Sequence, residues 1–189
     1  MKVQRTTDSL KGHFLIATPA IESGFFKQTV IYICEHGEAG ATGIIINKPL
    51  DLYLADIFEH LKIQPLLSHD EVSVMAGGPV KVDRGFVLHS PDKTFDATLK
   101  VTSDVWLTTS KDVLADIAAG TGPEKHLVAL GSAGWSAGQL EQEIAENSWL
   151  TVVADEQVLF ETTIKQKFEA AGNLLGIDIR LLTLQAGHG

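Results

Sequence analysis

A Gly-Trp-Ser-Ala-Gly run at positions 134–138 has the G-x-S-x-G spacing of a nucleophile elbow. Such an elbow exposes its serine between a strand and a helix, and the surrounding pattern predicts an apolar strand before the run and a helix after it. Asp178, or alternatively Asp155, and then His188 follow Ser136 in the order Ser, Asp, His. These residues are the candidate catalytic set of a serine hydrolase.

Three features of the sequence count against this hydrolase hypothesis. Ser136 and Gln139 have the Ser-x-x-Gln spacing of a capping box, so Ser136 is predicted to cap a helix that begins near Ala137. His188 lies one residue from the C-terminus, where chain ends are often poorly ordered. The segments upstream show no regular β-α-β alternation. The leading hypothesis is therefore a non-catalytic binding or regulatory protein, and the serine hydrolase is the alternative.

The same loop also has a binding interpretation. Its glycines keep side chains away from a helix N-terminus, whose free N–H groups attract an anion. Trp135 offers a flat face on which a ligand stacks. The alternative is a tight connection with Trp135 in the core, which the frequency of buried aromatic residues favours.

The stretch from Val72 to Ser90 is the second candidate region. Gly77-Gly78-Pro79 predicts a tight turn between two buried strands, because glycine permits backbone conformations that other residues avoid. Arg84 suits a bidentate contact to a carboxylate or phosphate. The alternative for Arg84 is a structural pairing with Asp83 or with an acidic residue of the 137–147 helix.

We expect the 72–90 stretch to form one wall of a groove, with Trp135–Gln139 opposite. The residues that we expect to bind a ligand are Gly77, Gly78, Arg84, His89, Trp135, Ser136, Gln139 and Asn47.

Cys34 and His36 point to the same face if their strand continues, since strand side chains alternate. Cys34 ends a strongly apolar run, however, so a buried and unreactive cysteine is favoured over a reactive thiol. The seven histidines are scattered without HxH or HExxH spacing. No metal site and no cofactor are predicted.

Hydrophobic periodicity predicts a sheet with helices inserted between groups of strands. One helix has Leu54, Ile57, Phe58 and Leu61 on one face, a second runs between Ser110 as its cap and Gly120, a third follows Ser136, and a fourth ends at Gly176. Strands are predicted at His13–Thr18, Gln28–Glu35, Gly43–Asn47, Val72–Ala76, Gly85–Leu88, Ala97–Val101, Val105–Thr108, His126–Leu130, Trp149–Ala154 and Val158–Phe160. This order favours an α+β fold with a mixed sheet.

The composition narrows the class of partner. The chain has 189 residues and a net charge of −9, so it lacks the broad basic surface on which most nucleic-acid affinity depends. No apolar run approaches the roughly 20 residues that span a bilayer. Pro19 and Glu22 interrupt the only apolar run near the N-terminus, which is a poor signal peptide. We expect a cytoplasmic protein whose partner is an unidentified small molecule or another protein, and neither nucleic acid nor a membrane.

Four blocks together resemble the YqgE/AlgH family of bacterial proteins. They are LIATPAIESGFFKQTVIYICEHGEAGATGIIINKP within 12–49, GGPVKVDRGFVLHS at 77–90, GSAGWSAGQLEQEIAENSWL at 131–150, and a final LGID followed by Gly187-His188. The resemblance covers almost the whole chain and implies one domain over residues 1–189. It also implies an α+β fold in which a mixed, bent and branched sheet forms a pseudo-barrel with about four helices around it.

The resemblance implies little about activity. The family has no agreed enzymatic activity, and one of its names comes from a proposed role in regulating transcription. No recognised DNA-binding motif accompanies that name in this sequence. A regulatory role is therefore an expectation from the family name alone.

Overall fold

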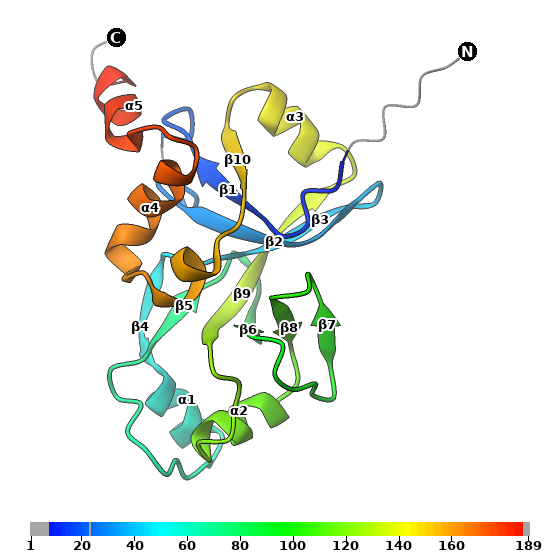
Figure 1. Ribbon diagram of the computed structural model, residues 1–189, viewed down its shortest axis with the longest axis vertical. Coiled ribbons are helices and arrows are strands. Elements are labelled where there is room, and N and C mark those ends of the chain that lie inside the picture. Colours follow the sequence, from blue (N-terminus) through cyan, green and yellow to red (C-terminus); the bar gives the residue numbers. More distant parts are fainter. Residues whose placement is uncertain (1–7, 23, 187–189) are drawn as a thin grey trace.

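A computed structural model describes residues 8–22 and 24–186 of the chain, and its elements surround a strongly bent sheet (Figure 1). The strands are β1 (His13–Ala17), β2 (Val30–Gly37), β3 (Gly40–Ile45), β4 (Pro49–Tyr53), β5 (Ser73–Ala76), β6 (Val80–His89), β7 (Thr98–Lys100), β8 (Trp106–Thr108), β9 (His126–Ser136) and β10 (Trp149–Val153). The helices are α1 (Leu54–His60), α2 (Asp112–Ala118), α3 (Gln139–Ala145), α4 (Lys167–Leu174) and α5 (Ile179–Ala186).

The strand β9 joins the two halves of the sheet. Its second half pairs with β3, which continues through β2 and β1 to β10. Its first half lies between β5, which runs parallel to it, and β6, which continues through β8 to β7. β4 extends this lower half by pairing with β5. The α+β class and the bent, branched sheet expected from the sequence are confirmed.

Glycines permit a close backbone contact at the bend of β9. Gly131 has a φ of 79°, in the left-handed region that favours glycine, and a methyl group there would meet the carbonyl oxygen of Gly78. A methyl group on Gly77 would in turn meet the carbonyl oxygen of Gly131. The connection between β5 and β6 therefore crosses β9 with backbone against backbone.

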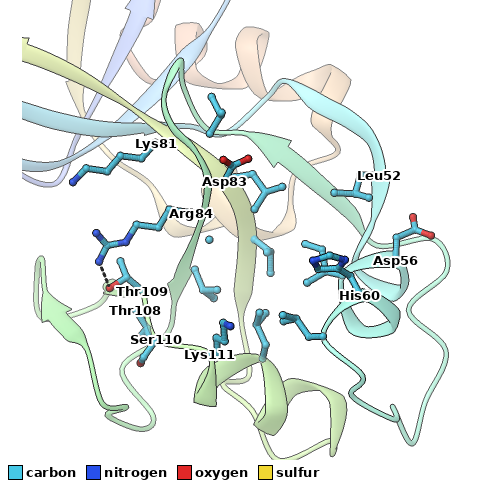
Figure 2. Close-up of a pocket in the computed structure, with 18 residues that line it drawn as sticks. Leu52, Asp56, His60, Lys81, Asp83, Arg84, Thr108, Thr109, Ser110 and Lys111 are labelled. Carbon is cyan, nitrogen blue, oxygen red and sulfur yellow. Dashed lines mark hydrogen bonds between the residues drawn. The ribbon is translucent and has the colours of Figure 1, made fainter.

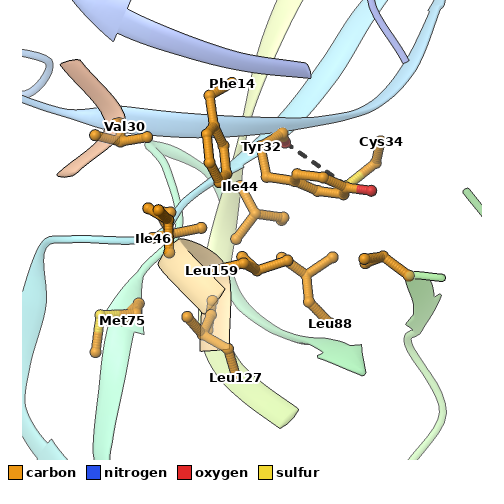
Figure 3. Close-up of a cluster of buried hydrophobic side chains, with 14 of the residues drawn as sticks. Phe14, Val30, Tyr32, Cys34, Ile44, Ile46, Met75, Leu88, Leu127 and Leu159 are labelled. Atoms are coloured by element: carbon orange, nitrogen blue, oxygen red, sulfur yellow. Dashed lines mark hydrogen bonds between the residues drawn. The ribbon is translucent and has the colours of Figure 1, made fainter. Parts of the chain in front are cut away.

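Three clusters of buried apolar side chains hold the helices to the sheet. The largest fills the inside of the bend, where Phe14, Tyr32, Ile44, Leu88 and Leu159 lie together (Figure 3), and α4 contributes Ala171 to it. A second cluster lies beneath α3 and includes Trp135 and Trp149. The third packs α1 and α2 against the outer face of the lower half-sheet. Helices α1 to α4 thus each cover an apolar part of the sheet, and α5 packs against α4.

Several predicted elements need correction. The strand predicted at His126–Leu130 continues to Ser136, because β3 pairs with residues 133–136 and supplies hydrogen bonds that the glycine-rich sequence did not suggest. The strand predicted at Val158–Phe160 is a π-helical turn at Gln157–Glu161, where the side chain of Asp155 accepts a hydrogen bond from the N–H of Val158.

Two predicted helix caps are also wrong. α3 begins after Gly138, which has a φ of 77° and is the N-cap, instead of after Ser136. α2 has Lys111 as its N-cap, and the hydroxyl of Ser110 hydrogen-bonds to the carboxylate of Asp112 instead. Two elements were not predicted: β4, which begins at a proline, as sheets permit at the first residue of a strand, and α5, which follows the last predicted helix.

Candidate functional site

A groove of about 1170 Å³ lies on the outer face of the lower half-sheet, between α1, β6 and the start of α2 (Figure 2). Its floor is apolar and is formed by Leu52, Ile57, Leu61, Val87, Leu114, Val128 and Leu130. Polar and charged side chains surround this floor: Lys81, Asp83 and Arg84 from β6, Asp56 and His60 from α1, and Lys111 at the start of α2. The groove therefore offers an apolar surface next to groups of both charges.

The groove exists because the two helices are short relative to the strands beneath them. α1 and α2 have seven residues each, so each is roughly 10 Å long at about 1.5 Å per residue. The regularly paired part of β6, residues 85–89, extends for roughly 17 Å at about 3.3 Å per residue, and the remainder of β6 lies beyond it. The helices bury one end of the apolar strip, and the remainder, near Leu52 and Leu130, stays partly open to solvent.

A bulge in β6 forms one wall of the groove. Val80 pairs with Ser132 and Gly85 pairs with Leu130, so four residues on β6 lie opposite a single residue on β9. The residues from 80 to 84 are all exposed. Lys81 has a φ of 51°, which is uncommon for a residue with a side chain. Bulges and left-handed residues occur preferentially next to binding and active sites.

The cations of the groove have no acidic partner among residues 8–22 and 24–186. No carboxylate lies within 4.0 Å of the charged nitrogens of Lys81, Arg84 or Lys111. Arg84 instead donates a hydrogen bond from Nη2 to Oγ1 of Thr109 over 3.2 Å. The ion pair considered for Arg84 from the sequence, with Asp83 or an acidic residue of α3, is not found.

Lys81 and Arg84 lie on the lip between this groove and a smaller hollow. Both side chains and Thr109 also line the hollow, which has a volume of about 490 Å³ and reaches toward β3 and β7. In Figure 2 they extend from β6 toward the side of Thr109, away from α1. The carboxylate of Asp56, on the opposite side, accepts a hydrogen bond from the N–H of Tyr53 at the start of α1. Among the residues that line the groove, positive charge is therefore concentrated on the β6 and α2 side, while Glu35 and Asp96 line the adjoining hollow.

His89, predicted to bind a ligand, is fully buried and lies outside the groove. Its Nε2 is 2.7 Å from Oγ1 of Thr108, and its Nδ1 is 2.8 Å from the carbonyl oxygen of Ser90. Burial lowers the pKa of His89, which favours the neutral ring. In this arrangement His89 holds β6 to β8.

Gly77, Gly78 and Asn47 also have structural contacts. The two glycines pack against the backbone of β9 at its bend. Asn47 accepts a hydrogen bond from the N–H of Val30 over 2.8 Å and donates one to the carbonyl of Gln28 over 2.9 Å, which ties the start of β2 to the end of β3. None of the three lines the groove.

The sequence predicted that Trp135, Ser136 and Gln139 form the opposite wall of the groove. This prediction is wrong, because none of the three lines the groove. Trp135 is buried, with its ring centroid 6.2 Å from that of Trp149. Oε1 of Gln139 accepts hydrogen bonds from the N–H of Ser136 over 2.9 Å and from its hydroxyl over 3.2 Å. This segment lies along β3, whereas the groove is lined from α1 and α2, which are distant from it in sequence.

The serine hydrolase alternative finds no support in the fold. Ser136 lies at the end of β9, and within residues 8–22 and 24–186 its hydroxyl hydrogen-bonds to Gln139 and to no histidine. The carboxylate of Asp178 is held by Arg180, which lowers the pKa of Asp178. Asp155 accepts a hydrogen bond from the N–H of Val158. His188 lies outside the described residues.

Cys34 and the potential metal ligands form no further chemical centre among the described residues. Cys34 is buried, as expected, and burial raises the pKa of its thiol, which disfavours the reactive thiolate. The described part of the chain holds no group of three or more His, Cys, Asp or Glu residues arranged to bind a metal ion. It also contains no helix with the length and apolar character needed to cross a bilayer.

The sequence identified Arg84 and, through the wall expected at 72–90, the β6 side of the groove, but it predicted no groove residue on α1 or α2. Lys81 and Lys111 are thirty residues apart, and nothing in their local sequence indicates that they share a site. A weak signal was present at Val80 and Val82, two apolar residues that alternate with charged ones and are exposed in the fold.

Two solved structures have the same fold as this chain. A protein of Corynebacterium diphtheriae, 18% identical, has the same fold, with a TM-score of 0.76 over 96% of this chain and 94% of that one. The solution structure of the AlgH protein from Pseudomonas aeruginosa is 47% identical, with a TM-score of 0.79 over the whole of both chains.

Relatives of similar length support the same assignment. A UPF0301 protein of Pseudoalteromonas translucida is 46% identical over 182 residues, which cover 95% of this chain and 98% of the relative. A UPF0301 protein of Thiobacillus denitrificans is 50% identical over 181 residues, which cover 95% and 97%. The family model described as AlgH-like matches residues 14–180. The resemblance seen in the sequence is confirmed, and the chain belongs to the AlgH-like family.

Proposed function

We propose that this protein is a non-catalytic binding protein and that the groove between α1, β6 and α2 is its binding site. One observation carries the proposal: an apolar floor lies beside three cations that have no carboxylate within 4.0 Å among the described residues. Apolar pockets with a few convergent polar groups are the usual form of a binding site. The ligand class that matches is an amphiphile with an anionic group.

A regulatory role fits this proposal if it acts through the bound partner. A net charge of −9 disfavours direct contact with DNA, so a regulatory effect on transcription would be indirect. The cytoplasmic location expected from the sequence belongs to the same proposal.

The test uses 8-anilinonaphthalene-1-sulfonate, which combines aromatic rings with an anion and fluoresces when it leaves water. We expect saturable binding to the native protein with one site per chain. Arg84→Glu and Val82→Glu are expected to weaken binding at least about fivefold, which corresponds to about 1 kcal/mol. Both residues are exposed, so both variants are expected to fold normally.

Two control variants carry the same charge change at exposed sites outside the groove. Lys165→Glu matches the reversal at Arg84, and Val153→Glu matches the substitution at Val82. Unchanged affinity in both controls, with weaker binding in the groove variants, supports the proposal. Equal affinity in all five proteins, or binding only to partly unfolded protein, overturns it.

A further inference from the structure

The open part of the groove is a region of the lower half-sheet that neither α1 nor α2 covers. α1 and α2 pack against the same face of the lower half-sheet and share one apolar cluster with Val87 and Val128 beneath them. Leu130, which lies further along the same face, is partly buried at the edge of that cluster and lines the groove. The sheet therefore presents an apolar strip beyond the two helices that it already holds.

The exposed apolar surface continues onto the wall of the groove. Val82 is 56% exposed and Val80 is 43% exposed, although both belong to a strand. Burying such side chains is favourable by roughly 25 cal/mol per Å² of apolar surface removed from water. An occupant that covers both the floor and the β6 bulge gains more than one that fills the floor alone.

We propose that the groove holds an amphipathic α-helix of a partner protein, with carboxylates along the flank that faces β6 and α2. This proposal rests on the groove being the binding site, as proposed above, and names the class of occupant. The groove has a volume of about 1170 Å³, which exceeds the range of about 300–1,000 Å³ that is usual for small-molecule pockets. Helices bind such grooves through apolar side chains at positions i, i+3, i+4 and i+7.

The charged residues of the groove indicate which side of it the acidic flank of the partner helix faces. Lys81, Arg84 and Lys111 lie along the β6 and α2 side, and Asp83 is the one carboxylate among the groove residues on that side. On the opposite side, Asp56 and His60 belong to α1. A helix with acidic residues toward β6 pairs with cations that lack acidic partners in the described chain, whereas a basic flank in that position would meet like charge.

A selection experiment tests the occupant without knowing the partner. The immobilised full chain is presented with a displayed library of 16-residue peptides in which all positions vary. We expect enriched peptides to repeat apolar residues at helical spacing and to carry Asp or Glu along one flank. A synthetic peptide of the most enriched sequence is expected to gain helical circular dichroism on binding.

Titration of that peptide, followed by fluorescence anisotropy, then locates the site. Lys81→Glu, Arg84→Glu and Val82→Glu are expected to weaken binding about tenfold each, while Lys165→Glu and Val153→Glu leave it unchanged. Thermal unfolding of each variant by circular dichroism confirms that it is folded. Enriched peptides without helical periodicity, or with basic flanks, overturn the proposal, as does equal binding to wild type and groove variants.

The two proposals fail in different ways. If 8-anilinonaphthalene-1-sulfonate binds the groove but no helical peptide is enriched, the groove is a binding site for another class of ligand and the helix proposal is wrong. If neither the sulfonate nor a peptide is sensitive to the groove variants, both proposals are wrong.

Discussion

Two short stretches of this chain combine apolar with polar residues, and the fold uses them in opposite ways. In residues 134–139, the polar groups bind one another, as Gln139 does with Ser136, and Trp135 is buried. In residues 80–84, five consecutive residues are exposed and border an apolar groove. The comparison teaches that satisfied polar groups mark a structural connection, whereas cations without acidic partners beside apolar surface mark a candidate binding site.

The largest expected effect is at Gly131, which lies on β9 opposite the 80–84 stretch and three residues before the 134–139 stretch. Gly131→Ala places a methyl group against the carbonyl of Gly78 and holds alanine at a φ of 79°. A left-handed alanine costs about 1–2 kcal/mol and overpacking costs about 1–3 kcal/mol, so we expect a loss of roughly 3 kcal/mol in the free energy of unfolding. Urea denaturation measures this loss.

Gly134→Ala is the matched control for Gly131→Ala. A methyl group at Gly134 meets no atom within 4 Å, so we expect a change within about 0.5 kcal/mol. Equal losses in the two variants would mean that the backbone contact between Gly131 and Gly78 is not what holds the bend.

The second expected effect is a loss of stability at His89, which was predicted to bind a ligand but lies outside the groove. His89→Leu removes the hydrogen bonds to Thr108 and Ser90 inside the fold. We expect a loss of about 2 kcal/mol, because the buried partner groups are left without His89. His60→Leu, at an exposed position in the groove, is expected to change stability by no more than about 0.5 kcal/mol. A destabilised His60→Leu with an unaffected His89→Leu would reverse these assignments.

Lys167 is buried, unlike the exposed cations of the groove, and its burial makes the stability of the protein depend on pH. Lys167 is buried and donates hydrogen bonds to the carbonyls of Leu159 and Ile46, and burial lowers its pKa to about 8. In the unfolded chain the lysine pKa is about 10.4. Between pH 8 and this value the unfolded chain therefore binds more protons than the folded chain, so the contribution of Lys167 to the free energy of unfolding rises with pH.

Paired denaturation of wild type and Lys167→Met measures this contribution. From pH 7.5 to pH 9.5 we expect the wild type to gain up to about 2 kcal/mol relative to the variant, since each pKa unit corresponds to about 1.4 kcal/mol. Parallel pH dependence of the two proteins would show that Lys167 has an ordinary pKa in the fold.

The smallest expected effect is at Ser136. Ser136→Ala removes an exposed hydroxyl whose hydrogen bond to Gln139 is long, so stability is expected to change by less than about 0.5 kcal/mol. A fluorophosphonate probe is expected to label neither protein. Labelling of the wild type that is lost in Ser136→Ala would restore the serine hydrolase hypothesis.

Local sequence predicted most of the fold, because many of its elements carry a strong local signal. The apolar runs of β1 and β2 and the helical spacing of α1 correspond closely to the elements found, whereas β3 begins three residues before and ends two residues before the strand predicted at Gly43–Asn47. The turn at Gln157–Glu161 was predicted as a strand because its short apolar run does not distinguish the two structures. β9 was predicted too short because its second half depends on pairing with β3, about ninety residues earlier in the chain.

The groove was harder to predict than the fold. It requires α1, the β6 bulge and the start of α2 to meet, and no local pattern specifies that meeting. Arg84 was recognised by its chemistry, whereas Lys81 becomes notable only through its φ of 51° and its position on the bulge. Residues 134–139 were overvalued because their glycines and serine match a motif whose function depends on tertiary contacts.

The most direct test of the contrast between the two stretches is a map of ligand contacts over the whole backbone. Two-dimensional ¹⁵N–¹H spectra of the protein, titrated with 8-anilinonaphthalene-1-sulfonate, report every amide at once. We predict shifts concentrated at residues 52–61, 81–87 and 109–114, with residues 134–139 unaffected. Shifts concentrated at 134–139, with the groove unaffected, would contradict the assignment of the binding site.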